Sequence, residues 1–117
     1  GFRVPISDKH NRRVENRLPG ADSNPYLAMA ASLVCGYIGM VDRMVPAKAI
    51  TGSAYNRART LPRTLEAALD RFSACTPVRN LLGEEFFEIF YAVKDYELFN
   101  YQSVVSSWER EHLLLRV

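Results

Sequence analysis

Cysteine is scarce in this chain of 117 residues: it contains Cys35 and Cys75 alone, both in segments with helical patterns. Their spacing matches no metal-binding motif, and two cysteines do not make the framework of a small disulfide-rich domain. We interpret them as two buried, reduced thiols, and a disulfide between them is the open alternative. With 48% hydrophobic residues, the chain is expected to fold around the core of one domain.

Lysine is scarce as well, because only three of the 15 basic residues are lysine and twelve are arginine. The formal net charge of +2 is too small to indicate a nucleic acid or a membrane surface as the partner. Arginine suits fixed, two-pronged contacts with carboxylate and phosphate groups, whereas lysine acts as a mobile point charge. The bias therefore favours specific contacts with anions, and a GC-rich genome is the alternative cause.

A hydrophobic run long enough to span a membrane is also missing. The longest run, residues 26–41, is short for a bilayer, rich in alanine and glycine, and lacks the basic start of a signal peptide. We expect a core helix there, no membrane association, and a cytoplasmic protein. The chain opens at Gly1 without a methionine and enters a strand-like segment at once, so we also expect a piece of a longer protein.

The overall pattern predicts a mainly α fold with a short N-terminal β-hairpin (α+β). Residues 1–6 and 12–18 are predicted as two short strands joined by a polar loop at 7–11, and Pro5 places the first strand at an edge. The Pro-Gly pair that follows breaks the chain. From residue 24 to residue 117 the chain is predicted to be helical.

Helix boundaries are indicated by capping residues. Asn24 is a suitable N-cap and Pro25 a suitable first residue for a helix that reaches Val41 or Arg43. A second helix is expected at 65–74, capped by Thr64 and ended by Thr76-Pro77, and residues 78–82 are expected to form one short turn. A long helix is expected at 84–104. A last short helix is expected at 108–112, capped by Ser106 or Ser107. Residues 44–63 are expected to be irregular.

Packing faces are predicted for two of these helices. Gly36 and Gly39 each cost about 1 kcal/mol relative to alanine in an exposed helix interior, so we expect other elements to pack tightly against them. In the segment 84–104, one apolar stripe has helical spacing and is predicted to face the core. Its members are Phe86, Ile89, Phe90, Val93 and Val104, with Tyr96 at the margin.

The clearest chemical pattern is the segment 12–19, RRVENRLP. Alternate side chains of an extended strand point to the same face, so Arg13, Glu15 and Arg17 are predicted to share one face. A carboxylate between two guanidinium groups keeps its charge. The residues alone leave two interpretations: a structural ion pair, or a site in which Glu15 binds a divalent cation and the arginines bind anionic oxygens.

Together with Asn-Pro-Tyr at 24–26, which opens a helix rich in small residues, this segment resembles the glutamine synthetase family. The family pattern is a basic residue, Arg, an apolar residue, Glu, any residue, Arg, an apolar residue and Pro, followed by a short loop and Asn-Pro-Tyr. Residues 64–69 also resemble a family helix, and residues 107–114 are more like the γ-glutamylpolyamine synthetase branch. The resemblance implies the C-terminal portion of a glutamine synthetase catalytic domain, with active-site residues on the hairpin at 1–18.

The resemblance implies an ATP-dependent ligase that joins glutamate to ammonia or a polyamine through γ-glutamyl phosphate. It implies Mg²⁺ or Mn²⁺ as the cation, ATP as co-substrate, and a homo-oligomer of stacked rings in the parent protein. By position it implies Glu15 as the metal ligand and Arg17 as the catalytic, glutamate-binding arginine. Arg3 and Arg13 correspond to arginines that bind the nucleotide or its phosphates.

We expect the chain by itself to be inactive and to hold neither ATP nor the cation tightly. One carboxylate is too few for Mg²⁺, and the other ligands of the family belong upstream. A non-catalytic helical interaction module is the alternative function. A basic nucleic-acid binder is a third, and the net charge of +2 argues against it. The residues do not define the amine substrate.

Overall fold

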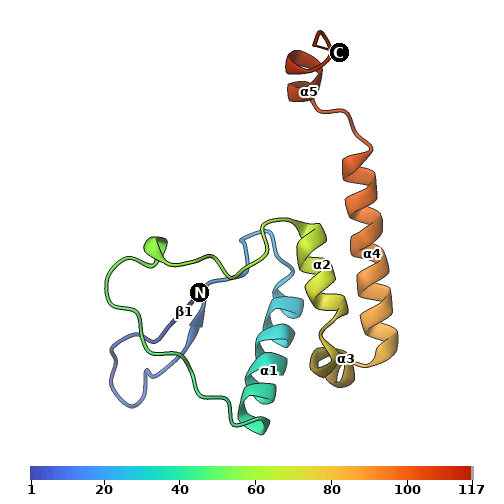
Figure 1. The fold of residues 1–117 in the computed structure, drawn as a ribbon. Helices are drawn as coiled ribbons and strands as arrows, with labels where there is room; N and C mark the ends of the chain where they lie inside the picture. Colours follow the sequence, from blue (N-terminus) through green and yellow to red (C-terminus); the bar gives the residue numbers. More distant parts are fainter. Residues whose placement is uncertain (117) are drawn as a thin grey trace. The chain divides into compact units, whose positions relative to one another are not determined.

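The computed structural model describes residues 1–116, with the backbone alone for Ala54. The described chain is mainly helical with a short N-terminal hairpin, which confirms the predicted fold class (Figure 1). It divides into two compact units, Gly1–Lys48 and the part from Ala49 onward, and each is described by itself.

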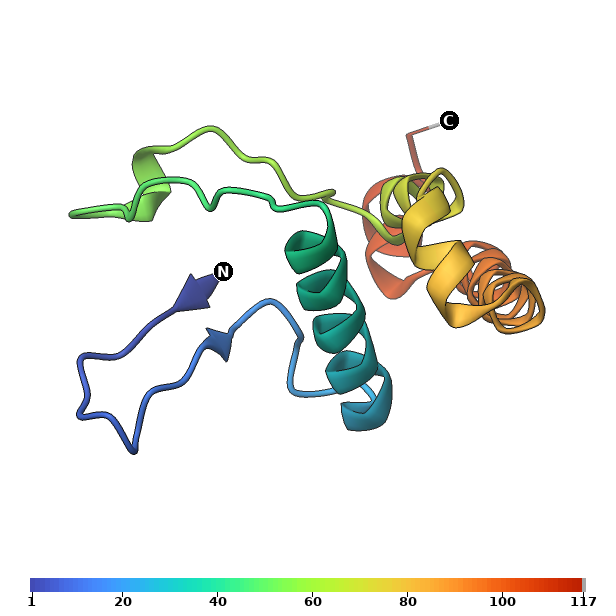
Figure 2. The ribbon, with the colours of Figure 1, turned by 90° about the horizontal axis from the view of Figure 1, so that it is seen from below.

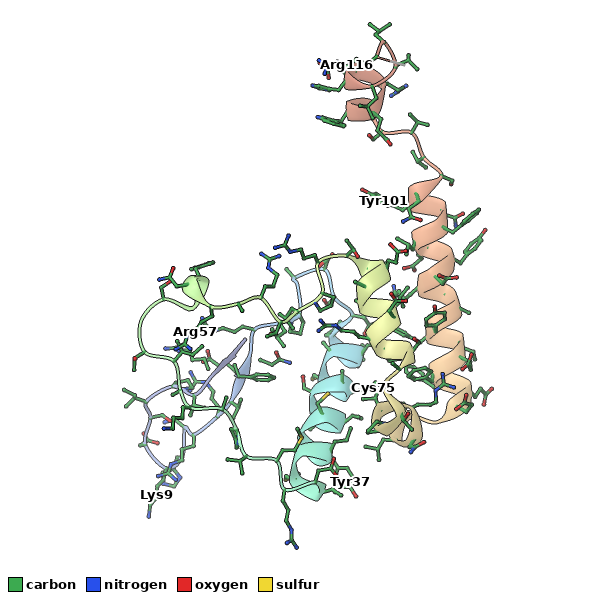
Figure 3. All side chains as sticks on the ribbon, viewed as in Figure 1. Lys9, Tyr37, Arg57, Cys75, Tyr101 and Arg116 are labelled. Carbon is green, nitrogen blue, oxygen red and sulfur yellow. The ribbon has the colours of Figure 1, made fainter. Side chains whose placement is uncertain are left out.

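The hairpin of the first unit pairs β1 (Phe2–Arg3) with β2 (Glu15–Asn16) in antiparallel fashion. The strands are much shorter than the predicted 1–6 and 12–18, because Pro5 has no N–H to donate to a ladder. The loop between them extends away from the following helix, and Lys9 lies at its tip (Figures 2 and 3).

The loop between the strands closes on Asp8. Its carboxylate accepts hydrogen bonds from the backbone N–H of His10 at 2.9 Å and of Asn11 at 3.0 Å. Hydrogen bonds from the Asn11 side chain and from these two N–H groups lower the pKa of Asp8. The loop is therefore a local turn that holds the two strands in one register.

The first unit continues with α1 (Pro25–Val41), which begins where the sequence predicts. The Asn24 side chain accepts hydrogen bonds from the N–H groups of Tyr26 at 3.0 Å and Leu27 at 3.3 Å. The helix ends in a left-handed turn at Arg43, whose φ is +50°. The N–H of Met44 reaches back to the carbonyl of Gly39 at 2.9 Å, which is the Schellman arrangement.

The predicted packing against α1 is absent from the described residues. A Cβ atom added at Gly36 or Gly39 would meet nothing within 4 Å. The helix has no fully buried residue, and one face exposes apolar side chains at helical spacing. These side chains are Tyr26, Met29, Leu33, Tyr37 and Met40, which are between 53% and 77% exposed.

The second unit is a helical segment. After a short 3₁₀ turn, η1 (Ala54–Asn56), it contains α2 (Leu65–Ser73), α3 (Thr76–Leu82), α4 (Glu84–Gln102) and α5 (Ser107–His112). Figure 1 shows α2 and α4 side by side and running in opposite directions, with α3 between them in the chain.

One predicted boundary in the second unit needs correction, and the predicted stop at Gly83 before a helix from Glu84 is confirmed. Thr76 and Pro77 do not simply end a helix but begin α3. Proline fits the first turn of a helix, because the N–H that it lacks would have no hydrogen-bond partner within the helix there. Gly83 has φ +86° and ψ 147°, a conformation reserved for glycine, and this sharp turn lets α4 begin at once.

The core of the second unit is aromatic. Phe72 of α2 stacks on Phe87 of α4 with ring centroids 4.1 Å apart, and its edge meets Phe90 at 5.4 Å. Phe87 is 0% exposed, and the Arg79 guanidinium lies 4.2 Å above its ring. Arg79 also pairs with Glu88 at 3.0 Å. These contacts hold α3 and α2 on one face of α4.

The predicted core stripe of α4 is therefore wrong, except for the half-buried Phe90. Phe86, Ile89, Val93 and Tyr96 are 38% to 65% exposed, and Val104 lies beyond the helix and is 67% exposed. Phe87 is buried in their place. Apolar residues surround the first turns of α4, so spacing alone does not select one face; the position of Phe72 does.

Both cysteines are free thiols. Cys35 is exposed and Cys75 is half-buried, so the prediction of two buried thiols is wrong, and the alternative of a disulfide is not realised. None of the described helices has the length and apolar character needed to cross a lipid bilayer.

Candidate functional site

Four charged residues meet on one side of the hairpin. Arg13, Glu15 and Arg17 lie on the same face, as the alternation of the strand predicts. The antiparallel register then places Arg3 directly opposite Glu15. The structure thus brings together all four residues that the sequence selected.

Glu15 is the centre of this arginine cluster. Its Oε1 lies 3.1 Å from Nη2 of Arg13, and its Oε2 lies 3.2 Å from Nη1 of Arg3 and 3.2 Å from Nη2 of Arg17. Both carboxylate oxygens therefore accept charge-assisted hydrogen bonds, which are stronger than neutral ones. We call these four residues the arginine cluster below.

The cluster has an excess of positive charge at its surface. The Glu15 side chain is only 24% exposed, whereas those of Arg3, Arg13 and Arg17 are 54% to 60% exposed. Desolvation raises the pKa of Glu15, but the hydrogen bonds from Arg3 and Arg17 outweigh it and leave the pKa below its ordinary value. Glu15 therefore stays ionised, and three cations surround one anion.

The arrangement suits an anionic ligand. A guanidinium carries five N–H donors, and Glu15 uses only one or two of them on each arginine. Arg13 gives a further donor, Nη1, to the carbonyl of Asn11 at 3.4 Å. The other donors lie on exposed side chains and can bind phosphate oxygens in a two-pronged manner. Since three such groups converge within one short hairpin, the cluster can hold a group with several negative oxygens.

A divalent cation fits the described residues only in part. They contain no group of three His, Cys, Asp or Glu side chains that could hold a metal ion. Glu15 can supply one oxygen ligand, and Mg²⁺ usually combines one or two carboxylates with phosphate oxygens. The cluster therefore fits a cation that phosphate oxygens or further carboxylates also hold.

A cleft of about 430 Å³ opens beside Arg13. Its walls are mainly apolar, and the lining residue Ser7 has a buried hydroxyl without a hydrogen-bond partner among the described residues. The lining consists of Val4, Pro5, Ile6 and Val14 together with Ser7, Arg12 and Arg13. An apolar cleft beside exposed guanidinium groups suits a ligand with an uncharged part and an anionic part.

Sequence reasoning missed the connection between the hairpin and α1. Asn16 donates a hydrogen bond from Nδ2 to Oγ of Ser32 at 2.9 Å. The alternation of the strand places Asn16 on the face opposite Glu15, which is the available signal, but nothing in the sequence selects Ser32 as its partner.

The hairpin thus carries a cluster in which three arginines surround one acidic side chain, and this arrangement can bind an anionic group. The family model of the glutamine synthetase catalytic domain matches residues 1–113. The chain belongs to the glutamine synthetase family.

Several curated relatives support this membership. The chain is 40% identical to glutamate–isopropylamine ligase of a Pseudomonas species, over 83% of this chain and 22% of that protein. It is 34% identical to gamma-glutamylputrescine synthetase of Escherichia coli K12, over 97% of this chain and 24% of that protein. It is 29% identical to glutamine synthetase of Methanosarcina mazei, over 97% of this chain and 27% of that protein. The chain thus spans about a quarter of the length of these relatives.

Proposed function

We propose that the chain is the C-terminal part of an ATP-dependent glutamate–amine ligase and supplies it with phosphate-binding arginines and one cation ligand. The observation that carries the proposal is the arginine cluster, in which three arginines surround Glu15, and the resemblance to the family implies these roles for its residues. Membership of a family of ligases gives the reaction class.

Each residue of the cluster has a separate role in this proposal. Arg3 and Arg13 bind the nucleotide and its phosphates, and the cleft beside Arg13 receives the uncharged part of the nucleotide. Arg17 binds glutamate and stabilises the negative charge that develops on the transferred phosphoryl group. Glu15 provides one ligand to Mg²⁺ or Mn²⁺, which supplies charge neutralisation for phosphoryl transfer when it is bound.

The amine is proposed to be an organic primary amine, such as an alkylamine or a diamine. The two relatives named for isopropylamine and putrescine are 40% and 34% identical to the chain, whereas the relatives named glutamine synthetase are 28% to 32% identical. Because ATP and free glutamate are cytoplasmic metabolites, we place the enzyme in the cytoplasm.

The open face of α1 supports the proposal that other segments complete the domain. Apolar side chains at helical spacing, exposed on a helix with no fully buried residue, suit a surface that packs against further protein. In the parent enzyme these segments would be the rest of the catalytic domain and neighbouring subunits of its rings. The chain alone is therefore proposed to lack ligase activity.

The same open face favours the second candidate, a non-catalytic helical interaction module. The two functions differ in what they require of the cluster, since an interaction module does not need its arginines to bind phosphate.

Calorimetric titration with tripolyphosphate at low salt separates the two candidates. We expect Arg17→Ala to weaken binding about 5-fold or more, since one charge-assisted hydrogen bond contributes about 1 kcal/mol or more. Arg57→Ala, which removes the same charge from an exposed position in the second unit, is the matched control and should change little. Equal losses in both variants, or no binding by the original chain, would contradict the ligase proposal.

A further inference from the structure

We propose that Asn16 is a positioning residue, which fixes the arginine cluster to α1 through Ser32. This inference rests on the proposed function of the cluster, but its geometry does not. Asn16 neighbours Glu15 in β2 and occupies the position that the family motif leaves open to any residue.

The contacts of Asn16 form a short relay between three parts of the first unit. Its Oδ1 accepts a hydrogen bond from the N–H of Leu18 at 3.0 Å, and its Nδ2 donates to Oγ of Ser32 at 2.9 Å. The hydroxyl of Ser32 in turn donates to the carbonyl of Ala28 at 2.8 Å. Both ends of the Asn16 amide are thus engaged, which fixes the rotation of the side chain.

The hairpin needs such an attachment because it is very small. Each strand has two residues, and an isolated two-stranded hairpin is marginally stable in water. Among the described residues, the bond from Asn16 to Ser32 is the one side-chain hydrogen bond between the hairpin and α1. Without it, no side-chain hydrogen bond among the described residues would fix the orientation of the paired strands relative to α1.

The attachment sets the direction in which the cluster faces. Successive side chains of a strand point to opposite faces, so anchoring Asn16 toward α1 turns Glu15 and the arginines that pair with it away from the helix. Ser32 and Asn16 are both half-buried, and the residues around Ser32 on α1 are small, which allows the strand to lie close to the helix. Asn16 therefore acts on the ligand only through the placement of the whole cluster relative to α1.

The test uses Ser32→Ala, which removes the acceptor without changing a residue of the cluster. We expect tripolyphosphate affinity to fall about 5- to 10-fold, as for the loss of one part-buried hydrogen bond. We also expect the amide protons of β1 and β2 to exchange faster in NMR spectra, while circular dichroism shows α1 still helical. Ser32→Thr should restore both properties, because threonine in a helix can make the same bonds.

Ser73→Ala in α2 is the matched control, since its hydroxyl also donates to a backbone carbonyl within the helix but joins no second element. It should leave both readouts unchanged. The inference is overturned if Ser32→Ala binds tripolyphosphate like the original chain, or if Ser32→Thr fails as Ser32→Ala does. If the original chain does not bind tripolyphosphate at all, the proposed function fails, and the hydrogen exchange of β1 and β2 still decides the role of Asn16.

Discussion

Replacing Gly36 and Gly39 by alanine tests whether the surface of α1 around these two residues is free of packing contacts in this chain. In the described structure an added Cβ at either position meets nothing within 4 Å, so the substitution brings no steric cost. Alanine is favoured over glycine in a helix interior by up to about 1 kcal/mol per residue. We therefore expect each variant to be more stable by up to about 1 kcal/mol, and the pair by up to about 2 kcal/mol if the effects add.

The assay is urea unfolding followed by far-ultraviolet circular dichroism, with amide hydrogen exchange of α1 as a local measure. The control is Gly83→Ala, because Gly83 also has open space around it but has a φ of +86°. This control should lose about 1 to 3 kcal/mol of stability through backbone strain. If Gly36→Ala or Gly39→Ala destabilises the chain instead, some segment of the chain packs on that face, and the account of α1 is refuted.

Three further predictions follow from the structure. Phe87→Ala should destabilise the second unit by about 3 to 5 kcal/mol, because it removes a fully buried ring that Phe72 and Arg79 contact. Thermal unfolding measures this loss of stability, and Phe99→Ala, at an exposed position, is the control. The pKa of Glu15 is lowered on folding, so its stabilisation of the hairpin is complete above the ordinary pKa of glutamate and is lost as the pH falls through the folded value. Glu15→Gln should therefore remove the acid-induced loosening of β1 and β2 in NMR spectra, and an unchanged acid response would show that Glu15 is not its source. In a longer protein that covers α1, Gly36→Ala and Gly39→Ala should destabilise rather than stabilise, since overpacking costs about 1 to 3 kcal/mol.

Part of the arginine cluster could be predicted from the sequence alone. The alternation of an extended strand was enough to place Arg13, Glu15 and Arg17 on one face, and the structure confirms it. The contact of Arg3 with Glu15 depends on strand register, which the loop turn at Asp8 helps to set. Only the family resemblance selected Arg3 beforehand.

Helix ends were predictable where a local capping group defines them. Asn24, Thr64 and Ser106 each cap the helix that the sequence predicts, with side-chain hydrogen bonds to the first turn. At Ser106 the capping box is complete, because the Glu109 carboxylate accepts a hydrogen bond from the backbone N–H of Ser106, and this bond lowers the pKa of Glu109. Such signals lie within a few residues, so they can be read without tertiary structure.

Packing faces were not predictable in the same way. The choice of Phe87 over Phe86 as the buried ring depends on where Phe72 lies, which is a contact between two helices. Likewise, glycine in α1 predicts close packing only if a partner is present, and the described residues provide none at Gly36 and Gly39. The bond from Asn16 to Ser32 is also a tertiary contact between residues that local patterns treat as ordinary.

The most direct test of the central claim is a chimera of gamma-glutamylputrescine synthetase of Escherichia coli, in which residues 1–113 of this chain replace the matching segment. The measurement is ATP-dependent amide formation from glutamate and putrescine, compared between the chimera and its Glu15→Gln variant. The account predicts an active chimera whose activity falls at least about 100-fold with Glu15→Gln, as for the loss of a transition-state charge contact. Equal activity of the two proteins would contradict the role of Glu15 and its arginines in the reaction.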